Sequence, residues 1–488
     1  MPECNPLIDN FMTCSELRGM HISKVKGSGA GVVFLTECYL VLPVLLWSFA
    51  WLQLWYAVPI VLGIFYVLYR HFVALRSSAG DVHDITWISS LVYCGISSLA
   101  VFLCGFDGRV MQSWDLIVRN PIYSELITNE WPLVMPDGRM VMYALMFWLP
   151  PALVSKWLPG MEALFLQLWC FIGCMLMLLN LHGTLGLRKT ILFAIVIGVF
   201  TPLSGLVDDV LNVVFHKDAM MGVHFRIPSA GTQWTNTFHY FIVGGLYLTL
   251  VTERRLPLGV YVMVSALFAC FHPILASVVL PLVVYQAVLM IGGWRRIWRV
   301  AMLPEALIGG VLVLTCMLYY ASGGSCWWAF TLNAPYAPQN APWLVYVLGI
   351  ILAVVPPVLV WWSTRRRIML LWAALCPVII SCWYGETNGV NEWMYKFTVL
   401  YSFYVVYYLV RYIEVRRVKC VLGCLLLCSV LPFLRMVDHS GIIDSARRGF
   451  PVQECHFMNQ WHGTLYHPEH ELYFKLTSEK RPTQWLFR

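Results

Sequence analysis

Residues 31–52 read GVVFLTECYLVLPVLLWSFAWL, and apolar runs of this kind decide the fold. Coiled as a helix, such a run is long enough to cross about 30 Å of hydrocarbon. Similar runs recur as far as Met436, and the chain is 59% hydrophobic and only 12% charged, with a mean hydropathy of +0.68. The sequence therefore predicts an all-α, polytopic helical membrane protein and excludes an ordinary soluble domain.

Three regions are expected along the chain. Residues 1–28 form an N-terminal segment on the cytoplasmic side, without the continuous apolar stretch of a cleavable signal peptide. Residues 29–436 form the membrane domain, with roughly thirteen spans. Within it, residues 259–293 read as two short helices broken at Phe271-His272-Pro273. Residues 437–488 are expected to pack over the outer face.

Basic residues assign the loops to two sides of the membrane, because cytoplasmic loops carry an excess of Lys and Arg. The opposite, outer side receives loops 106–140 and 205–237 and the tail. Counting spans from the two ends of the chain gives results that differ by one crossing between residues 141 and 189. A re-entrant or split segment is expected there, at the proline-rich stretch WLPPALVSKWLPG (residues 148–160). The cytoplasmic set comprises Lys24, Lys26, Arg70, Arg76, Arg254, Arg255, Arg295, Arg296, Arg299, Arg365, Arg366, Arg367, Arg411, Arg416, Arg417 and Lys419.

The remaining composition narrows the function classes. A net charge of +7 in such a chain indicates orientation and attraction to anionic lipid, so the lipid bilayer is an expected partner and nucleic acid is not. Most of the cysteines lie inside apolar runs, and no common zinc spacing occurs, so neither a metal nor another cofactor is expected. Motifs of nucleotide hydrolysis, zinc proteolysis and serine hydrolysis are missing from the sequence.

The first polar segment of the outer face reads DGRVMQSWDLIVRNPIYSELITNEWP (residues 107–132). Asp107 and Asp115 are close to two helical turns apart, which places both carboxylates on one face of a helix. The apolar positions between Trp114 and Trp131 form a partial stripe, typical of an amphipathic helix lying in the interface. Two interpretations stay open: a structural interfacial helix, or a helix that presents a reactive acid.

Two further segments carry polar residues at the outer face. Asp208 and Asp209 are adjacent and point different ways on a helix, so they are poor candidates for an acid/base pair. Lys396 follows Glu392 by four residues, a helical pair spacing, and either snorkels to the interface or holds a phosphate. The acids cluster at the ends of spans, which disfavours a transporter.

The order of these pieces resembles the GT-C superfamily of membrane glycosyltransferases, which use polyprenyl-phosphate-linked sugars, and more closely a little-characterised bacterial branch of it. The resemblance rests on four stretches and touches most of the chain in the right order. Arg119-Asn120-Pro121 stands where the branch has Lys-His-Asn, and Lys396 where it has arginine. The stretches are residues 112–156, SGLVDDVL with VHFRIPSAGTQWTNTFHYF, TNGVNEWMYKFTVLY, and NQWHGTLYHPEHELYFKL.

The resemblance implies roles for particular residues. Asp115, with Asp107 as the nearest substitute, would be the general base that deprotonates the acceptor hydroxyl. Lys396, Arg226 and His224 would hold the donor phosphate. The acceptor or the sugar would contact Trp114, Arg119, Asn120, Asp209, Trp234, Asn236 and Asn391.

The expected function is therefore an inverting GT-C-type glycosyltransferase. It would move a sugar from a polyprenyl-phosphate donor to a surface glycan or glycolipid acceptor, at the outer side of a bacterial inner (plasma) membrane. Two alternatives stay open. One is a polymerase or ligase of lipid-linked oligosaccharide, which predicts essential arginines in a large outer loop. The other is a transporter or flippase, which predicts internal repeats and charged residues in mid-span.

Overall fold

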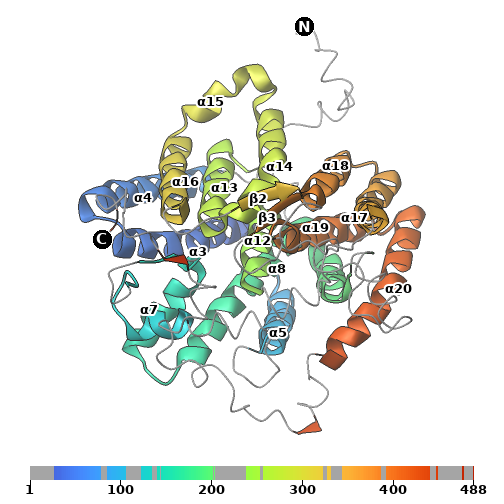
Figure 1. Cartoon of the computed structure of the whole chain (residues 1–488), viewed down its shortest axis with the longest axis horizontal. Helices are drawn as coiled ribbons and strands as arrows, with labels where there is room; N and C mark the ends of the chain where they lie inside the picture. Colours follow the sequence, from blue (N-terminus) through green and yellow to red (C-terminus); the bar gives the residue numbers. More distant parts are fainter. Residues whose placement is uncertain are drawn as a thin grey trace.

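The computed structural model shows that the residues it describes are almost entirely helical (Figure 1). It describes residues 27–77, 85–105, 122–134, 140–142, 144–201, 203, 238–252, 256–321, 327–330, 343–385, 392–439, 447–448, 475–476 and 487. Its α-helices are α3 (Gly27–Trp51), α4 (Leu54–Ser77), α5 (Trp87–Leu103), α7 (Leu149–Trp157), α8 (Glu162–Val199), α12 (Phe238–Val251), α13 (Leu258–Phe271), α14 (Pro273–Ile291), α15 (Trp298–Ala301), α16 (Pro304–Ala321), α17 (Trp343–Thr364), α18 (Ile368–Ser381), α19 (Glu392–Arg411) and α20 (Arg416–His439). Two short 3-10 helices are η1 (Met146–Trp148) and η2 (Trp294–Arg296).

Several of these helices are long and apolar enough to cross a membrane. Among the described residues there are 7 of them: α3, α4, α8, α14, α16, α17 and α20. Four shorter apolar helices, α5, α12, α13 and α18, accompany them. The prediction of a polytopic helical membrane protein is confirmed at this level.

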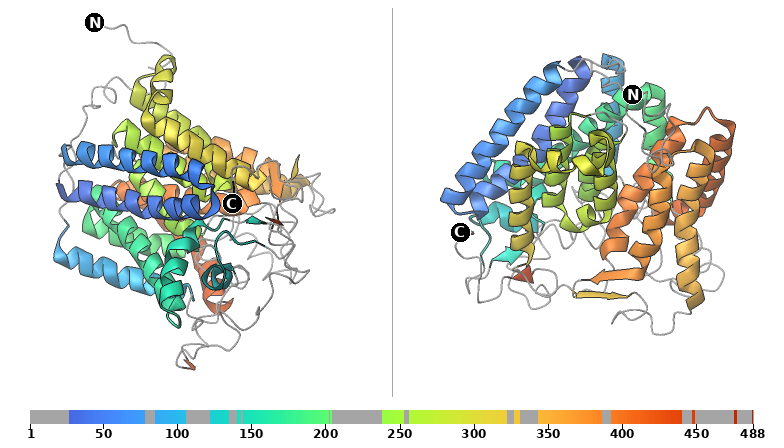
Figure 2. Two further views of the ribbon diagram at one scale, coloured as in Figure 1. Left: turned by 90° about the vertical axis from the view of Figure 1, so that its left-hand side faces the viewer. Right: turned by 90° about the horizontal axis from the view of Figure 1, so that it is seen from above.

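Among the described residues, four short strands, which the all-α prediction did not include, form two antiparallel ribbons. β1 (Val141–Met142) pairs with β4 (Lys475–Leu476), and β2 (Trp327–Phe330) pairs with β3 (Cys382–Gly385). Both ribbons lie at the same end of the helix bundle, which we call the ribbon end (Figure 2). Strand pairing supplies hydrogen-bond partners for backbone that has left a helix.

The basic residues gather at the opposite end, which we call the basic end. α16 is followed by β2 and α18 by β3, so the loops before these helices lie away from the ribbons. Those loops carry Arg295, Arg296 and Arg299, and Arg365 to Arg367. α4 starts beside Leu52, which bridges to Phe487 near the ribbons, and so ends with Arg76 at the basic end. The loops before α16 and α18 and the end of α4 therefore place their basic residues at one end of the bundle, as the sequence predicts.

The region where the two span counts disagreed contains two departures from a regular span. α7 has 9 residues, about 14 Å of helix, which is too short to cross the hydrocarbon layer. α8 has 38 residues and is broken at Gly186, whose φ of 74° and ψ of 170° are not helical. A residue with a side chain is strained at such a positive φ, so glycine suits this position.

The break in α8 lies at the basic end, next to the connection between α19 and α20. The Arg411 guanidinium donates a hydrogen bond to the Thr184 carbonyl at 3.4 Å, and the Lys189 ammonium donates one to the Arg411 carbonyl at 3.0 Å. Lys189 also pairs with Glu414 at 2.9 Å. Residues 162–185 and 187–199 therefore form two helical segments joined by a turn that is bound to the α19–α20 turn.

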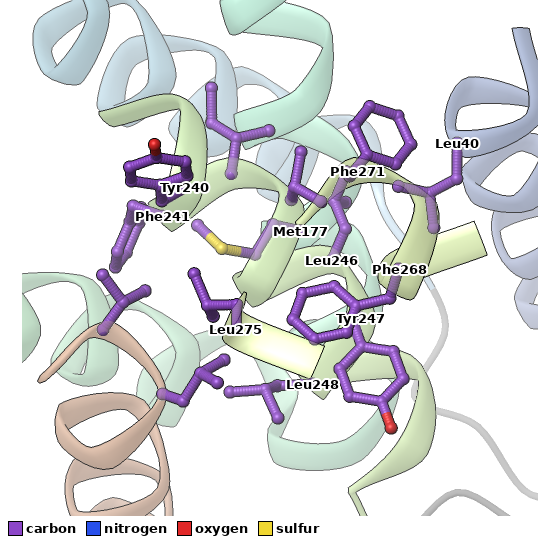
Figure 3. Close-up of a cluster of buried hydrophobic side chains, with 14 of the residues drawn as sticks. Leu40, Met177, Tyr240, Phe241, Leu246, Tyr247, Leu248, Phe268, Phe271 and Leu275 are labelled. Atoms are coloured by element: carbon purple, nitrogen blue, oxygen red, sulfur yellow. The ribbon is translucent and has the colours of Figure 1, made fainter. Parts of the chain in front are cut away.

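Large apolar side chains fill the centre of the bundle around α12. Every residue of α12 is buried. Tyr240, Phe241 and Leu246 of this helix lie among Met177 of α8 and Leu275 of α14 (Figure 3). Because α12 is surrounded on all sides, it has no polar face, as expected for a helix inside a bundle.

Gly173 of α8 lies at a tight contact with α3 and α12. A Cβ at this position would lie 2.4 Å from Ile242 Cγ2 and 2.7 Å from the Tyr39 hydroxyl. Tyr39 itself is fixed, because it donates a hydrogen bond to the Trp169 carbonyl at 3.1 Å and stacks on the Trp169 ring at 3.9 Å. Small residues allow this kind of close contact between membrane helices.

Candidate functional site

Lys396 is a buried cation near the ribbon end of the bundle. It lies early in α19, which follows β3 along the chain, and the residue is only 9% exposed. Its ammonium group lies 5.3 Å from the centroid of the Tyr240 ring, within the range of a cation–π interaction. An ammonium group in such a place is costly unless partners or a bound anion offset the loss of water.

Two histidines lie on the other sides of the same tyrosine. The His272 ring meets the Tyr240 ring edge-on at 3.8 Å, and the His239 ring lies 3.8 Å from it in a tilted arrangement. His239 and His272 are 3% and 5% exposed, and their rings are 5.9 Å apart. Lys396, Tyr240, His239 and His272 thus form one buried group, which we call the Lys396 cluster.

Three pieces of local structure bring this cluster together. His239 and Tyr240 lie in the first turn of α12. His272 caps both α13 and α14, because Pro273 starts a new helix and the preceding residue takes an extended φ of −150°. The predicted break at Phe271-His272-Pro273 is confirmed, and it places an imidazole beside α12.

Aromatic residues of η1 close another side of the cluster. The rings of Trp148 and Phe147 lie 5.3 Å and 5.6 Å from the His239 ring. Both residues are buried, at 0% and 2% exposure. The proline-rich segment thus contributes an apolar wall to the Lys396 cluster, which restricts the access of water and strengthens electrostatic interactions there.

Beyond this wall, a small outer layer contains residues 122–134 and α7. Tyr123 is buried and donates a hydrogen bond to the Glu162 carbonyl at 3.0 Å. Lys156 lies over the Trp131 ring at 4.8 Å. Loss of water raises the pKa of Glu125, against a smaller opposing effect of the hydrogen bond from Asn129. The same cause lowers the pKa of Lys156.

Lys396 is the one predicted site residue within the described ranges. Its helical spacing from Glu392 is confirmed, since both lie in α19. The other predicted residues lie outside the described ranges: Asp107, Asp115, Trp114, Arg119, Asn120, Asp209, His224, Arg226, Trp234, Asn236 and Asn391.

The sequence did not identify Tyr240 as a partner of Lys396, nor His272 as a neighbour of Tyr240. The structure places His239 beside His272, and the sequence contained no signal for this contact. The signal for His272 was its position before Pro273 between two apolar runs. In the part of the chain that the structure describes, no three His, Cys, Asp or Glu side chains are placed to hold a metal ion together.

The expectation that acids lie at the ends of spans is wrong for Glu37. This residue lies well inside α3 and is 0% exposed. Its partner His71 belongs to α4, so the compensating group is far away in the sequence. Hydropathy averages over a window, and one acid in an otherwise apolar run does not change the average enough to reveal the position.

Comparisons of the chain with protein-family models, with curated proteins and with solved structures found no significant match. The resemblance to GT-C enzymes thus stays a prediction. The chemical basis for a function lies in the Lys396 cluster and in the arrangement of the helices around it.

Proposed function

We propose that the protein is a polytopic membrane glycosyltransferase that takes its sugar from a polyprenyl-phosphate donor. The observation that carries the proposal is the burial of Lys396 against Tyr240 and beside two histidines, close to the ribbon end of an apolar bundle. A cation there suits a ligand that has a phosphate at the interface and a long apolar tail in the membrane. A lipid-linked sugar has both parts.

The proposal includes a topology. Thirteen helical segments would cross the membrane in a GT-C-like arrangement, with α8 counted as two segments because of its break at Gly186. The basic end would face the cytoplasm, in agreement with the positive-inside rule, and the ribbon end would face the outside of a bacterial inner membrane. The segments are α3, α4, α5, residues 162–185 and 187–199 of α8, α12, α13, α14, α16, α17, α18, α19 and α20.

The proposed reaction is a single displacement at the anomeric carbon. The carboxylate of Asp115, or of Asp107, accepts the proton of the acceptor hydroxyl. The acceptor oxygen forms a bond to the anomeric carbon on the face opposite the phosphate. The bond between that carbon and the phosphate oxygen breaks, and its electron pair leaves with the polyprenyl phosphate. Inversion of the sugar follows from this geometry.

The cationic groups have a separate role from the base. Negative charge grows on the leaving phosphate as the bond breaks, and Lys396, with Arg226 and His224, would stabilise it. Burial strengthens this interaction because little water competes for the phosphate oxygens. The Tyr240 ring holds the ammonium group of Lys396 in place, and the two histidines pack against that ring.

Binding of the carrier lipid tests the proposal directly. The protein is reconstituted in nanodiscs, polyprenyl phosphate is added, and native mass spectrometry measures the bound fraction. Lys396→Met keeps the length of the side chain and removes its charge. Loss of one charge-assisted hydrogen bond, about 1.5–3 kcal/mol, predicts binding weaker by a factor of roughly 10–150.

A matched control is available in Lys156, which also lies over an aromatic ring but is only partly buried. Lys156→Met should leave lipid binding unchanged. Equal binding by the wild type and Lys396→Met would refute the role of the Lys396 cluster. Asp115→Asn should bind the donor normally and lose sugar transfer, and full transfer by this variant would refute the assignment of the base.

A further inference from the structure

A second group of ionisable side chains lies buried between α3, α4 and α16. The carboxylate of Glu37 lies 2.5 Å from His71 Nδ1, and His71 Nε2 lies 3.5 Å from a carboxylate oxygen of Glu305. The exposures of Glu37, His71 and Glu305 are 0%, 2% and 2%. We call these three residues the Glu–His–Glu cluster.

The cluster lies inside the apolar bundle, where a charge is expensive. An acid at the centre of a membrane helix costs about 2.5–3.5 kcal/mol on insertion scales, and such residues typically belong to ion or proton pathways. Two acids and a histidine from three helices therefore indicate a role beyond packing. The Lys396 cluster makes no use of them.

The cluster contains fewer hydrogen-bond donors than its carboxylate oxygens require. One oxygen of Glu37, one oxygen of Glu305 and Nε2 of His71 are buried without a hydrogen-bond partner. A neutral imidazole offers one N–H, whereas a protonated imidazole offers one to each carboxylate. An additional proton on the cluster thus supplies the donor that the geometry requires.

The charges lead to the same result. The guanidinium of Arg70 lies 3.6 Å from Glu305, so the neighbourhood contains one fixed positive charge and two carboxylates. With one proton held by His71 or by a glutamate, the net charge of the group is zero. Without that proton it is −1, in surroundings where a net charge is strongly disfavoured.

Exposure falls sharply between Arg70 and the three residues of the cluster. The Arg70 side chain is 40% exposed, whereas those of Glu305, His71 and Glu37 are 2%, 3% and 0% exposed. Glu305 lies in the first turn of α16, and Arg70 lies toward the end of α4, both at the basic end. Water therefore approaches the cluster from the basic end, past Arg70.

The helix packed on the far side leaves room for Glu305. Gly259 of α13 faces it, and a Cβ on Gly259 would lie 2.8 Å from the Glu305 carboxyl carbon. Arg70 on α4 is a charged neighbour of Glu305, and the Cys38 thiol on α3 interacts electrostatically with Glu37.

We propose that Glu37, His71 and Glu305 form a proton-binding site inside the bundle. The site takes up one proton from the basic end, past Arg70. Occupancy by the proton holds α3, α4 and α16 together by giving both carboxylates a donor. The ligand is the proton itself, and the site is independent of the proposed sugar transfer.

A hydrophobic carbodiimide tests this site, because the reagent modifies protonated carboxyl groups in apolar surroundings. The wild-type protein in nanodiscs is treated with dicyclohexylcarbodiimide across a pH series, and peptide mass spectrometry locates the modified residues. Glu37 or Glu305 should be modified. Above the midpoint of titration the labelling should fall about tenfold for each pH unit.

Variants and a control residue distinguish a proton site from unselective labelling and from a metal-cation site. Glu414, an exposed acid at the basic end paired with Lys189, should stay unmodified. Glu37→Gln should reduce the labelling of Glu305, because Arg70 and Glu305 are then neutral together without an added proton. Absence of labelling on both acids at every pH would overturn the proposal, as would labelling independent of pH. Loss of labelling on replacing choline with sodium or potassium at fixed pH would also overturn it, since a metal cation would then occupy the site.

Discussion

Gly173→Ala adds a single methyl group at the tight contact of α8 with α3 and α12. The new Cβ would lie 2.4 Å from Ile242 Cγ2, whereas carbon atoms pack best at about 3.5–4.0 Å, so neighbouring atoms must retreat by about 1 Å. Ile242 is 0% exposed, and Tyr39 is fixed by its hydrogen bond and its stacking on Trp169. Neither has room to move freely.

The expected loss of stability follows from two opposing effects. Overpacking of this kind costs about 1–3 kcal/mol. Alanine in place of glycine in a helix contributes up to about 1 kcal/mol in the other direction. We therefore expect a net loss of about 1–2 kcal/mol in the free energy of unfolding. The disturbance lies on α12, close to His239 and Tyr240, so binding of polyprenyl phosphate should weaken as well.

Gly198→Ala is the matched control on the same helix, because no atom lies within 4 Å of a Cβ at Gly198. It should be neutral or stabilising by up to about 1 kcal/mol. Both variants are compared with the wild type by reversible unfolding in mixed detergent micelles. If Gly173→Ala were as stable as Gly198→Ala, the close approach of the three helices would be refuted.

Three further predictions concern the ends of the bundle. Loss of water raises the pKa of Glu125 above its ordinary value of 4.5. The contribution of Glu125 to stability is therefore greatest below pH 4.5 and falls as the pH rises through the raised pKa. Glu125→Gln should flatten this part of a pH–stability curve. Phe487→Ala loses contacts with two aromatic rings at about 0.5–1.5 kcal/mol each, so the unfolding free energy should fall by about 1–3 kcal/mol, and an unchanged value would contradict this packing. Lys189→Gln removes the hydrogen bond that lowers the pKa of Glu414, so this pKa, measured by NMR, should rise toward 4.5; no change would show that the pair does not form in solution.

The sequence predicted the features that depend on neighbouring residues. Apolar runs identified the helices, and the Phe271-His272-Pro273 break was visible because proline acts on the residues next to it. The Glu392–Lys396 spacing placed Lys396 correctly on a helix. The proline-rich segment was recognised as irregular for the same local reason.

Features that join distant parts of the chain were not predictable in this way. Lys396, Tyr240 and His272 come from three helices, and a single sequence contains no signal for their contact. The same holds for Glu37 and Glu305, whose common partner His71 lies on a third helix. The sequence separates a span near Cys170 from one near Ile197, but it did not show that Gly186 forms the turn between them, because glycine is common in membrane helices.

The contact between the Gln53 side chain and the Phe487 carbonyl joins residues 434 positions apart, at 2.9 Å. At a synthesis rate of about 5–20 residues per second, roughly 20–90 s pass between the appearance of these two residues. During that time Trp47, whose ring later packs against Phe487, lacks this partner. The outer rim of the first two helices is therefore completed late in biosynthesis, and a chaperone or a lipid headgroup has a window in which to occupy it.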